Sequence, residues 1–171
     1  MTAPASPEDL FVFLESLGIE TRTVTHPPLF TVEDSRDLRG DLPGGHTKNL
    51  FLKDKKGRLF LVTCDESRKV DLKALEKSIG AARVSFGKPD LLLEVLGITP
   101  GAVTTFSLIN DRGDAPRVTF AIDAGLLKHD VIHCHPLHNE ATTAISPNDL
   151  MRFVAACGHQ AIQVEFDGPE S

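Results

Sequence analysis

The stretch GGHTKNLFLKDKKGRLFLVT, residues 44–63, is the strongest fold signal in the chain. Apolar residues at 50–52 and 59–62 predict two strands, and Asp54–Gly57 between them has the composition of a hairpin turn. Lys48 stands at the mouth of this apolar hairpin, shortly after two glycines. Lysines are common on the outer faces of strands, so the neighbouring sequence has to decide whether Lys48 is functional.

Length and composition indicate an ordinary soluble protein. The 171 residues suit one domain with a sizeable core, expected over residues 1–171 with its core at about 6–166. No apolar run approaches the roughly 20 residues of a membrane span, and the N-terminal MTAPASPEDLFVF lacks the pattern of a secretory signal. The odd set Cys64, Cys134 and Cys157 indicates reduced thiols, so we expect a cytoplasmic protein.

The charge is unevenly distributed along the chain. The net charge is −6, yet residues 48–88 hold 11 basic and 5 acidic residues, a local charge of +6. A basic segment within an acidic protein can present a phosphate-binding face and still avoid indiscriminate binding. On charge alone, a solvated surface of strands and helices is an equally good interpretation.

The remaining pattern predicts short helices and strands in alternation. Helices are expected at Ser6–Gly18, Thr31–Leu38, Asp71–Gly80, Pro89–Leu96 and Ser146–Gly158. Strands are expected at Glu20–Thr25, Val131–His135, Ala141–Ile145 and Ala161–Phe166, with a second hairpin formed by Phe106–Ile109 and Arg117–Ile122. This order predicts a mixed α/β fold around a largely antiparallel sheet.

Most standard catalytic motifs are absent. The sequence has no nucleophile elbow, no phosphate loop and no dinucleotide-binding fingerprint. A histidine cluster, His133, His135 and His138, would suit a metal site, which makes a metal-dependent hydrolase one alternative. A structural or substrate-positioning role for His135, which precedes Pro136, is the favoured interpretation.

Taken together, several segments resemble a known family. They are Lys48–Asp54, Val70–Leu72, Leu96–Gly101, Leu108–Asp111, His135–Leu137 and Thr142–Ser146. In this order they resemble the YbaK-like aminoacyl-tRNA editing domains, and within these the free-standing ProX-type proteins that remove alanine from mischarged proline tRNA. The resemblance runs from about residue 6 to residue 166.

The resemblance implies a partly barrel-like central sheet and hydrolysis of the ester that joins an amino acid to the tRNA 3′ end. It implies that Lys48 is the key functional residue and that His135 matches the family's histidine before Pro-Leu. Residues Gly101–Thr105 match a glycine-x-x-x-proline substrate loop, in which Thr105 replaces the proline. That replacement leaves the rigidity of the loop and the choice of substrate open.

The expected site therefore has three parts and no metal or cofactor. Lys48 and His135 are the candidate catalytic residues. The candidate substrate-binding residues are Asn49, Gly97, Thr99, Gly101, Thr105 and Asn139. The candidate tRNA-binding residues are Lys53, Lys55, Lys56, Arg58, Arg68 and Lys69.

The chemistry expected of such a site is simple. A site that activates proline cannot strongly reject a smaller amino acid, because a missing methylene is worth only about 1–3 kcal/mol. A second, tight site that hydrolyses the small product solves this problem. Lys48 would hold the terminal phosphate or polarise the ester carbonyl, water would attack, and the ribose hydroxyl or His135 would position or activate that water.

The expected partner is the acceptor end of mischarged tRNA(Pro), with prolyl-tRNA synthetase as a further candidate and the oligomeric state open. Besides the metal hydrolase, a tRNA- or nucleic-acid-binding module without catalytic activity is the second alternative. Substrate turnover separates the editing enzyme from that module.

Overall fold

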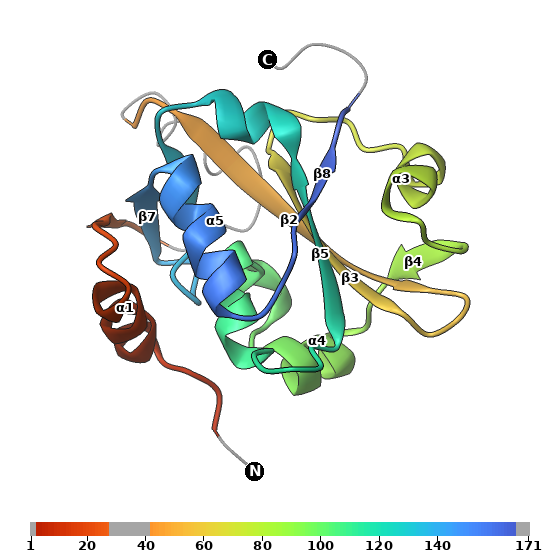
Figure 1. The fold of residues 1–171 in the computed structure, drawn as a ribbon, viewed down its shortest axis with the longest axis horizontal. Coiled ribbons are helices and arrows are strands. Elements are labelled where there is room, and N and C mark those ends of the chain that lie inside the picture. Colours follow the sequence, from red (N-terminus) through yellow and green to blue (C-terminus); the bar gives the residue numbers. More distant parts are fainter. Residues whose placement is uncertain (1–2, 28–41, 167–171) are drawn as a thin grey trace.

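The computed structural model describes residues 3–27 and 42–166, which form one mixed sheet with helices on both faces (Figure 1). The helix expected at Thr31–Leu38 lies outside the described residues. The described strands are β1 (Arg22–Thr25), β2 (Gly45–Asp54), β3 (Leu59–Asp65), β4 (Val84–Phe86), β5 (Val118–Asp123), β6 (Ile132–Cys134), β7 (Ala141–Ile145) and β8 (Ile162–Val164). The described helices are α1 (Pro7–Ser16), α3 (Leu72–Ile79), α4 (Pro89–Leu96) and α5 (Pro147–Ala156), with 3₁₀ turns η1 (Pro100–Ala102), η2 (Thr105–Asn110) and η3 (Ala124–Lys128).

The β2–β3 hairpin lies at the centre of the sheet, whose strand order is β1-β7-β6-β2-β3-β5-β8, with β4 paired to β2. Pairing is antiparallel for β1–β7, β6–β7, β2–β3 and β2–β4. It is parallel for β2–β6, β3–β5 and β5–β8. The expected mixed α/β fold is therefore confirmed, and the sheet is mixed and open.

The second predicted hairpin is wrong. Residues Thr105–Asn110 form the 3₁₀ turn η2 and not a strand. The expected second strand, β5, therefore pairs in parallel with β3 and not with residues 106–109. The side chain of Thr104 caps η2 by accepting from the Phe106 N–H, and the Asp111 carboxylate accepts from the N–H groups of Arg117 and Val118. These side-chain hydrogen bonds offer the backbone an alternative to a strand ladder, which an apolar pattern does not reveal.

The predicted helices begin and end where their capping residues stand. Ser6 and Asp9 form a reciprocal capping box at the start of α1, and Ser146 caps α5. Gly80 and Gly97 adopt the left-handed conformation that ends α3 and α4. The three-residue strand β4 was not predicted.

Alternation along the central hairpin divides the core between two faces of the sheet. Phe51 and Leu61 belong to the larger cluster, which includes residues of α1, α4 and α5. Leu52 and Val62 belong to the smaller cluster, which includes residues of α3. Among the described residues, no helix is long and apolar enough to cross a bilayer.

Candidate active site

Lys48 is held at the surface of the sheet. It lies in β2 opposite Cys64 of β3, it is half-buried, and its Nζ donates a hydrogen bond to the backbone carbonyl of Arg68. The amine is therefore tethered near the end of β3 and does not project freely into solvent. This tether gives the ammonium group a defined position before any ligand binds.

Cys64, the cross-strand neighbour of Lys48, is not a candidate nucleophile. Its side chain is buried, and burial raises the pKa of the thiol to about 12. Since the thiolate is the nucleophilic form, this cysteine stays unreactive near neutral pH.

The structure corrects the assignment of Arg68 to the tRNA-facing surface. The side chain is only 8% exposed, and its Nε and Nη2 donate to the carboxylate of Asp123 at 2.9 and 3.2 Å. Asp123 is fully buried at the end of β5 and also accepts from the N–H groups of Asp65 and Gly125. A buried, ion-paired guanidinium fixes the turn after β3, the turn whose carbonyl holds Lys48.

Asn49 lies on the opposite face of β2 from Lys48, because consecutive strand residues alternate. Its Oδ1 accepts a hydrogen bond from the Thr63 hydroxyl at 2.6 Å, and the Thr63 and Thr105 hydroxyls lie 2.7 Å apart. The structure therefore joins two predicted substrate-binding residues, Asn49 and Thr105, through a third residue that the sequence did not single out.

The outer edge of β2 changes partner along its length. Gly45 and His46 pair with β6, and Leu52–Asp54 pairs with β4. Between these two pairings, no strand within residues 3–27 and 42–166 pairs with this edge at residues 48–50. A ligand that reaches this part of the edge can approach Lys48 on one face and Asn49 on the other.

His135 follows the end of β6 and is half-buried. Its Nδ1 lies 3.2 Å from the carbonyl oxygen of Ala141, so this nitrogen carries the proton that the carbonyl accepts. Burial lowers the pKa of His135, and the nearby charges of His26 and His138 lower it further. A neutral imidazole with one nitrogen protonated leaves the other nitrogen, Nε2, as a proton acceptor.

His135 and Lys48 share one end of the sheet without a described contact. The parallel register pairs His46 with His133, and its continuation would set Lys48 opposite His135, but β6 stops at Cys134.

The histidine cluster does not form a metal site. The ring of His133 stacks on that of His46 at 4.4 Å between centroids, and its Nε2 donates to the Pro43 carbonyl at 3.0 Å. Within the part of the chain that the structure describes, which includes His133, His135 and His138, no group of three or more candidate ligands is arranged to hold a metal ion. The stacking therefore provides a structural role for His133.

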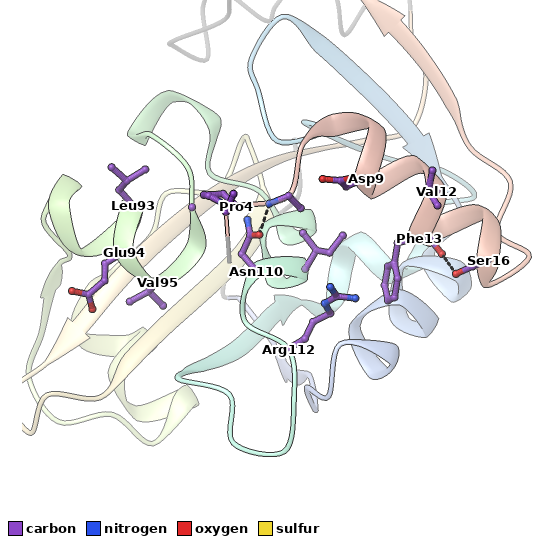
Figure 2. A pocket seen from close by; sticks show the side chains of 14 residues that line it. Pro4, Asp9, Val12, Phe13, Ser16, Leu93, Glu94, Val95, Asn110 and Arg112 are labelled. Carbon is purple, nitrogen blue, oxygen red and sulfur yellow. Dashed lines mark hydrogen bonds between the residues drawn. The ribbon is translucent and has the colours of Figure 1, made fainter. Parts of the chain in front are cut away.

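Two of the candidate substrate-binding residues, Gly97 and Thr105, lie in different places. Gly97 lines a hollow of about 680 Å³ beside α1 and α4, and a Cβ there would lie 2.7 Å from Pro4. Figure 2 shows Pro4 and Asn110, which also line this hollow. Asn110 closes this hollow by accepting from the Ala5 N–H and donating to the Leu96 carbonyl. Gly97 thus packs against the N-terminal segment, whereas Thr105, the last residue of the predicted loop Gly101–Thr105, bonds to the sheet.

For the other candidate substrate-binding residues, Thr99, Gly101 and Asn139, the structure gives a position in the fold. Thr99 is exposed and precedes the short turn η1, whose first residues include Gly101. Asn139 is half-buried in the connection between β6 and β7.

The predicted basic surface lies mainly at the far end of the hairpin. Lys53, Lys55, Lys56, Arg58 and Lys69 are exposed, and Arg58 also bonds to Asp54 at 2.8 Å. At about 3.3 Å per strand residue, Lys53 lies roughly 17 Å along β2 from Lys48.

A hollow of about 710 Å³ beside this end of the hairpin adds residues that the sequence reading missed. Lys53 and Lys55 line it together with Arg83 and Lys88, and Phe86 of β4 is 62% exposed there. The signal in the sequence was the placement of an aromatic residue between two cations, at Arg83, Phe86 and Lys88.

Comparisons with known proteins agree on one family. The sequence profile described as "Aminoacyl-tRNA editing domain" matches residues 26–153. The chain is 41% identical to the prolyl-tRNA synthetase associated domain-containing protein 1 of Danio rerio, over 94% of this chain and 87% of the relative. It is 35% identical to the prolyl-tRNA editing protein ProX of Acetoanaerobium sticklandii, over 89% of this chain and 92% of the relative.

A solved structure shares the fold. A candidate trans-editing enzyme for prolyl-tRNA synthetase superposes with a TM-score of 0.70, over 96% of this chain and 99% of the other. The two chains are 18% identical, so this likeness bears on the fold alone.

Proposed function

Because the chain belongs to the aminoacyl-tRNA editing domain family, we propose that it is a trans-editing deacylase that hydrolyses alanyl-tRNA(Pro). The names of the relatives support this choice: one is a prolyl-tRNA editing protein and another is a prolyl-tRNA synthetase associated domain protein. The alignment covers 87% and 92% of these two relatives, so a chain of this size can hold the activity that the name of the editing protein states.

One observation carries the proposal. Lys48 stands on the part of β2 whose outer edge no described strand covers, and its half-buried amine is tethered to the backbone carbonyl of Arg68. An ammonium group at this position can stabilise the negative charge that develops on the ester carbonyl oxygen as water attacks. The buried Cys64 thiol, with its pKa raised to about 12, supports water as the attacking group.

His135 is the proposed general base, in competition with the ribose hydroxyl of the substrate itself. Because burial keeps the pKa of His135 low, the imidazole is neutral near pH 7 and can accept a proton through Nε2. A loss of activity in His135→Ala and its retention with 2′-deoxy substrate would favour the histidine, and the reverse pattern would favour the ribose.

The exposed lysines at the hairpin turn are the proposed contacts for tRNA phosphates, and prolyl-tRNA synthetase is a proposed partner in the same step. The proposed compartment is the cytoplasm, where the three buried, unpaired cysteines remain reduced.

The deciding experiment measures release of the amino acid from alanyl-, cysteinyl-, seryl- and prolyl-tRNA by the wild type and by Lys48→Ala. We expect hydrolysis of the alanyl ester, little of the prolyl ester, and a loss of at least about a hundredfold on removal of the ammonium group. Lys77→Ala, which removes an exposed lysine of α3, is the matched control and should keep full activity.

Two outcomes would contradict the proposal. Unchanged deacylation by Lys48→Ala would remove the lysine from the mechanism. Binding of tRNA by the wild type without release of any amino acid would identify the chain as a binding module without catalytic activity.

A further inference from the structure

A continuous line of three side chains crosses the central hairpin on the face opposite Lys48. Asn49 stands on β2, Thr63 is its cross-strand partner on β3, and Thr105 opens η2. The two threonines are fully buried. The distances are 2.6 Å from Thr63 to Asn49 and 2.7 Å between the two hydroxyls.

The direction of this line is determined by counting protons. The carbonyl oxygen Oδ1 of Asn49 can only accept, so the single hydroxyl proton of Thr63 is used there. The oxygen of Thr63 must then accept from Thr105, which commits the Thr105 proton as well. The line therefore has one orientation, from Thr105 through Thr63 to Asn49.

The consequence is a fixed orientation of the Asn49 carboxamide. With Oδ1 bonded to the Thr63 hydroxyl, the NH₂ group is not the part of the carboxamide that contacts Thr63. The described residues offer this NH₂ group no hydrogen bond, so it keeps two donors for a ligand. Asn49 also belongs to the part of the β2 edge that neither β6 nor β4 covers.

We propose that Thr63 and Thr105 are positioning residues that hold the Asn49 carboxamide so that its NH₂ group donates to an oxygen of the aminoacyl ester. The inference rests on the proposed deacylase function. Lys48 supplies a charged donor on the opposite face of β2. A neutral amide donor held against the ester adds to the stabilisation of the negative charge that develops as water attacks.

The inference also accounts for Thr105, which stands where the resembled family has a proline. A proline fixes its own backbone but has no side-chain hydrogen-bonding group. Thr105 instead fixes the loop by a buried hydroxyl bond to β3, and the same bond orients the side chain of Asn49. Anchoring of the loop and orientation of the donor are thus linked in this chain.

A double-mutant cycle between Thr63 and Asn49 tests the inference. Thr63→Val keeps the shape of the side chain and removes its hydroxyl. We expect it to lower kcat for alanyl-tRNA(Pro) by about tenfold with KM within about twofold, because the lost orientation matters in the transition state. In the Asn49→Ala background, Thr63→Val should change kcat by less than about twofold, since its target is already gone.

Two further variants separate positioning from packing. Thr63→Ser restores a hydroxyl and should recover most of kcat. Thr143→Val is the matched control, because Thr143 is also fully buried and its hydroxyl lies 2.8 Å from that of Thr23 in β1. It removes an equivalent bond away from Asn49 and should leave kcat within about twofold in both backgrounds.

The outcomes distinguish this inference from the proposed function. Equal losses of kcat from Thr63→Val in both backgrounds, or no loss in either, would overturn the positioning role. In that case an inactive Lys48→Ala protein would still support the proposed deacylase function. If Thr63→Val does not fold, the same cycle with Thr105→Val decides. A wild type that releases no amino acid overturns both.

Discussion

Replacing Asp123 with Ala tests whether the buried ion pair with Arg68 holds the turn that contacts Lys48. Asp123 is fully buried and Arg68 is 8% exposed, so the substitution leaves a guanidinium in the interior without its counter-charge. Removing one partner of such a pair costs about 3–5 kcal/mol of the free energy of unfolding. At about 2–4 °C per kcal/mol for a chain of this size, the melting temperature should fall by roughly 6–20 °C.

Urea unfolding followed by far-UV circular dichroism is the appropriate assay, because the chain has no tryptophan or tyrosine to report by fluorescence. Arg117→Ala is the control, since it breaks an ion pair of similar length, 2.8 Å to Glu94, whose side chains are 52% and 63% exposed. That exposed pair should contribute less than about 1 kcal/mol. An Asp123→Ala protein that loses no more than the control would show that the ion pair does not stabilise the turn.

Three other predictions concern separate parts of the molecule. His135 has a pKa below its ordinary value because of burial and the charges of His26 and His138, so the unfolded chain binds a proton more readily than the folded one. The free energy of unfolding should therefore fall as the pH is lowered from about 7.5 to about 5.5, and it should fall less steeply in His135→Gln. Gly97→Ala should lower the unfolding free energy by at least about 1 kcal/mol, measured by urea titration, because Gly97 has a φ of 68°. Lys55→Gln should lessen by about one unit the slope of log binding constant against log salt for tRNA, and an unchanged slope would remove this lysine from the phosphate contacts.

Much of the fold could be predicted because its signals are local. Ser6 and Ser146 stand before helices with residues that complete their caps, and Gly80 and Gly97 end two others. The hairpin around Asp54 was equally visible. What the sequence could not reveal was partner choice. The pattern of β5 predicts a strand, but it does not show that this strand pairs in parallel with both β3 and the distant β8, or that Asp111 holds the loop before it.

The candidate site was predicted one residue at a time and not as an arrangement. Lys48, Asn49 and His135 were predicted from their motif and stay predictions, whereas Arg68 was assigned to the surface because a basic residue in a basic segment is usually exposed. Its buried partner, Asp123, lies 55 residues further on, and no local pattern connects the two. Thr63 was not singled out for the same reason, since nothing in the local sequence shows that its hydroxyl lies between the Asn49 amide oxygen and the Thr105 hydroxyl.

The proposed ligand site lies at residues 48–50 of β2, where no strand within residues 3–27 and 42–166 covers the outer edge. Strand β6 ends next to His135-Pro136, and a proline has no N–H with which to continue a ladder. Strand β4 ends at Phe86 and is followed by Gly87, where a Cβ would come within 2.4 Å of the Phe51 ring, so only glycine lets the chain turn away so closely. A proline and a glycine thus stop the two neighbouring strands on either side of residues 48–50, and a side chain at Gly87 should disturb substrate binding even though it touches neither Lys48 nor Asn49. A Gly87→Ala protein that folds and binds tRNA as the wild type does, with unchanged KM for the alanyl ester, would count against this account of the edge.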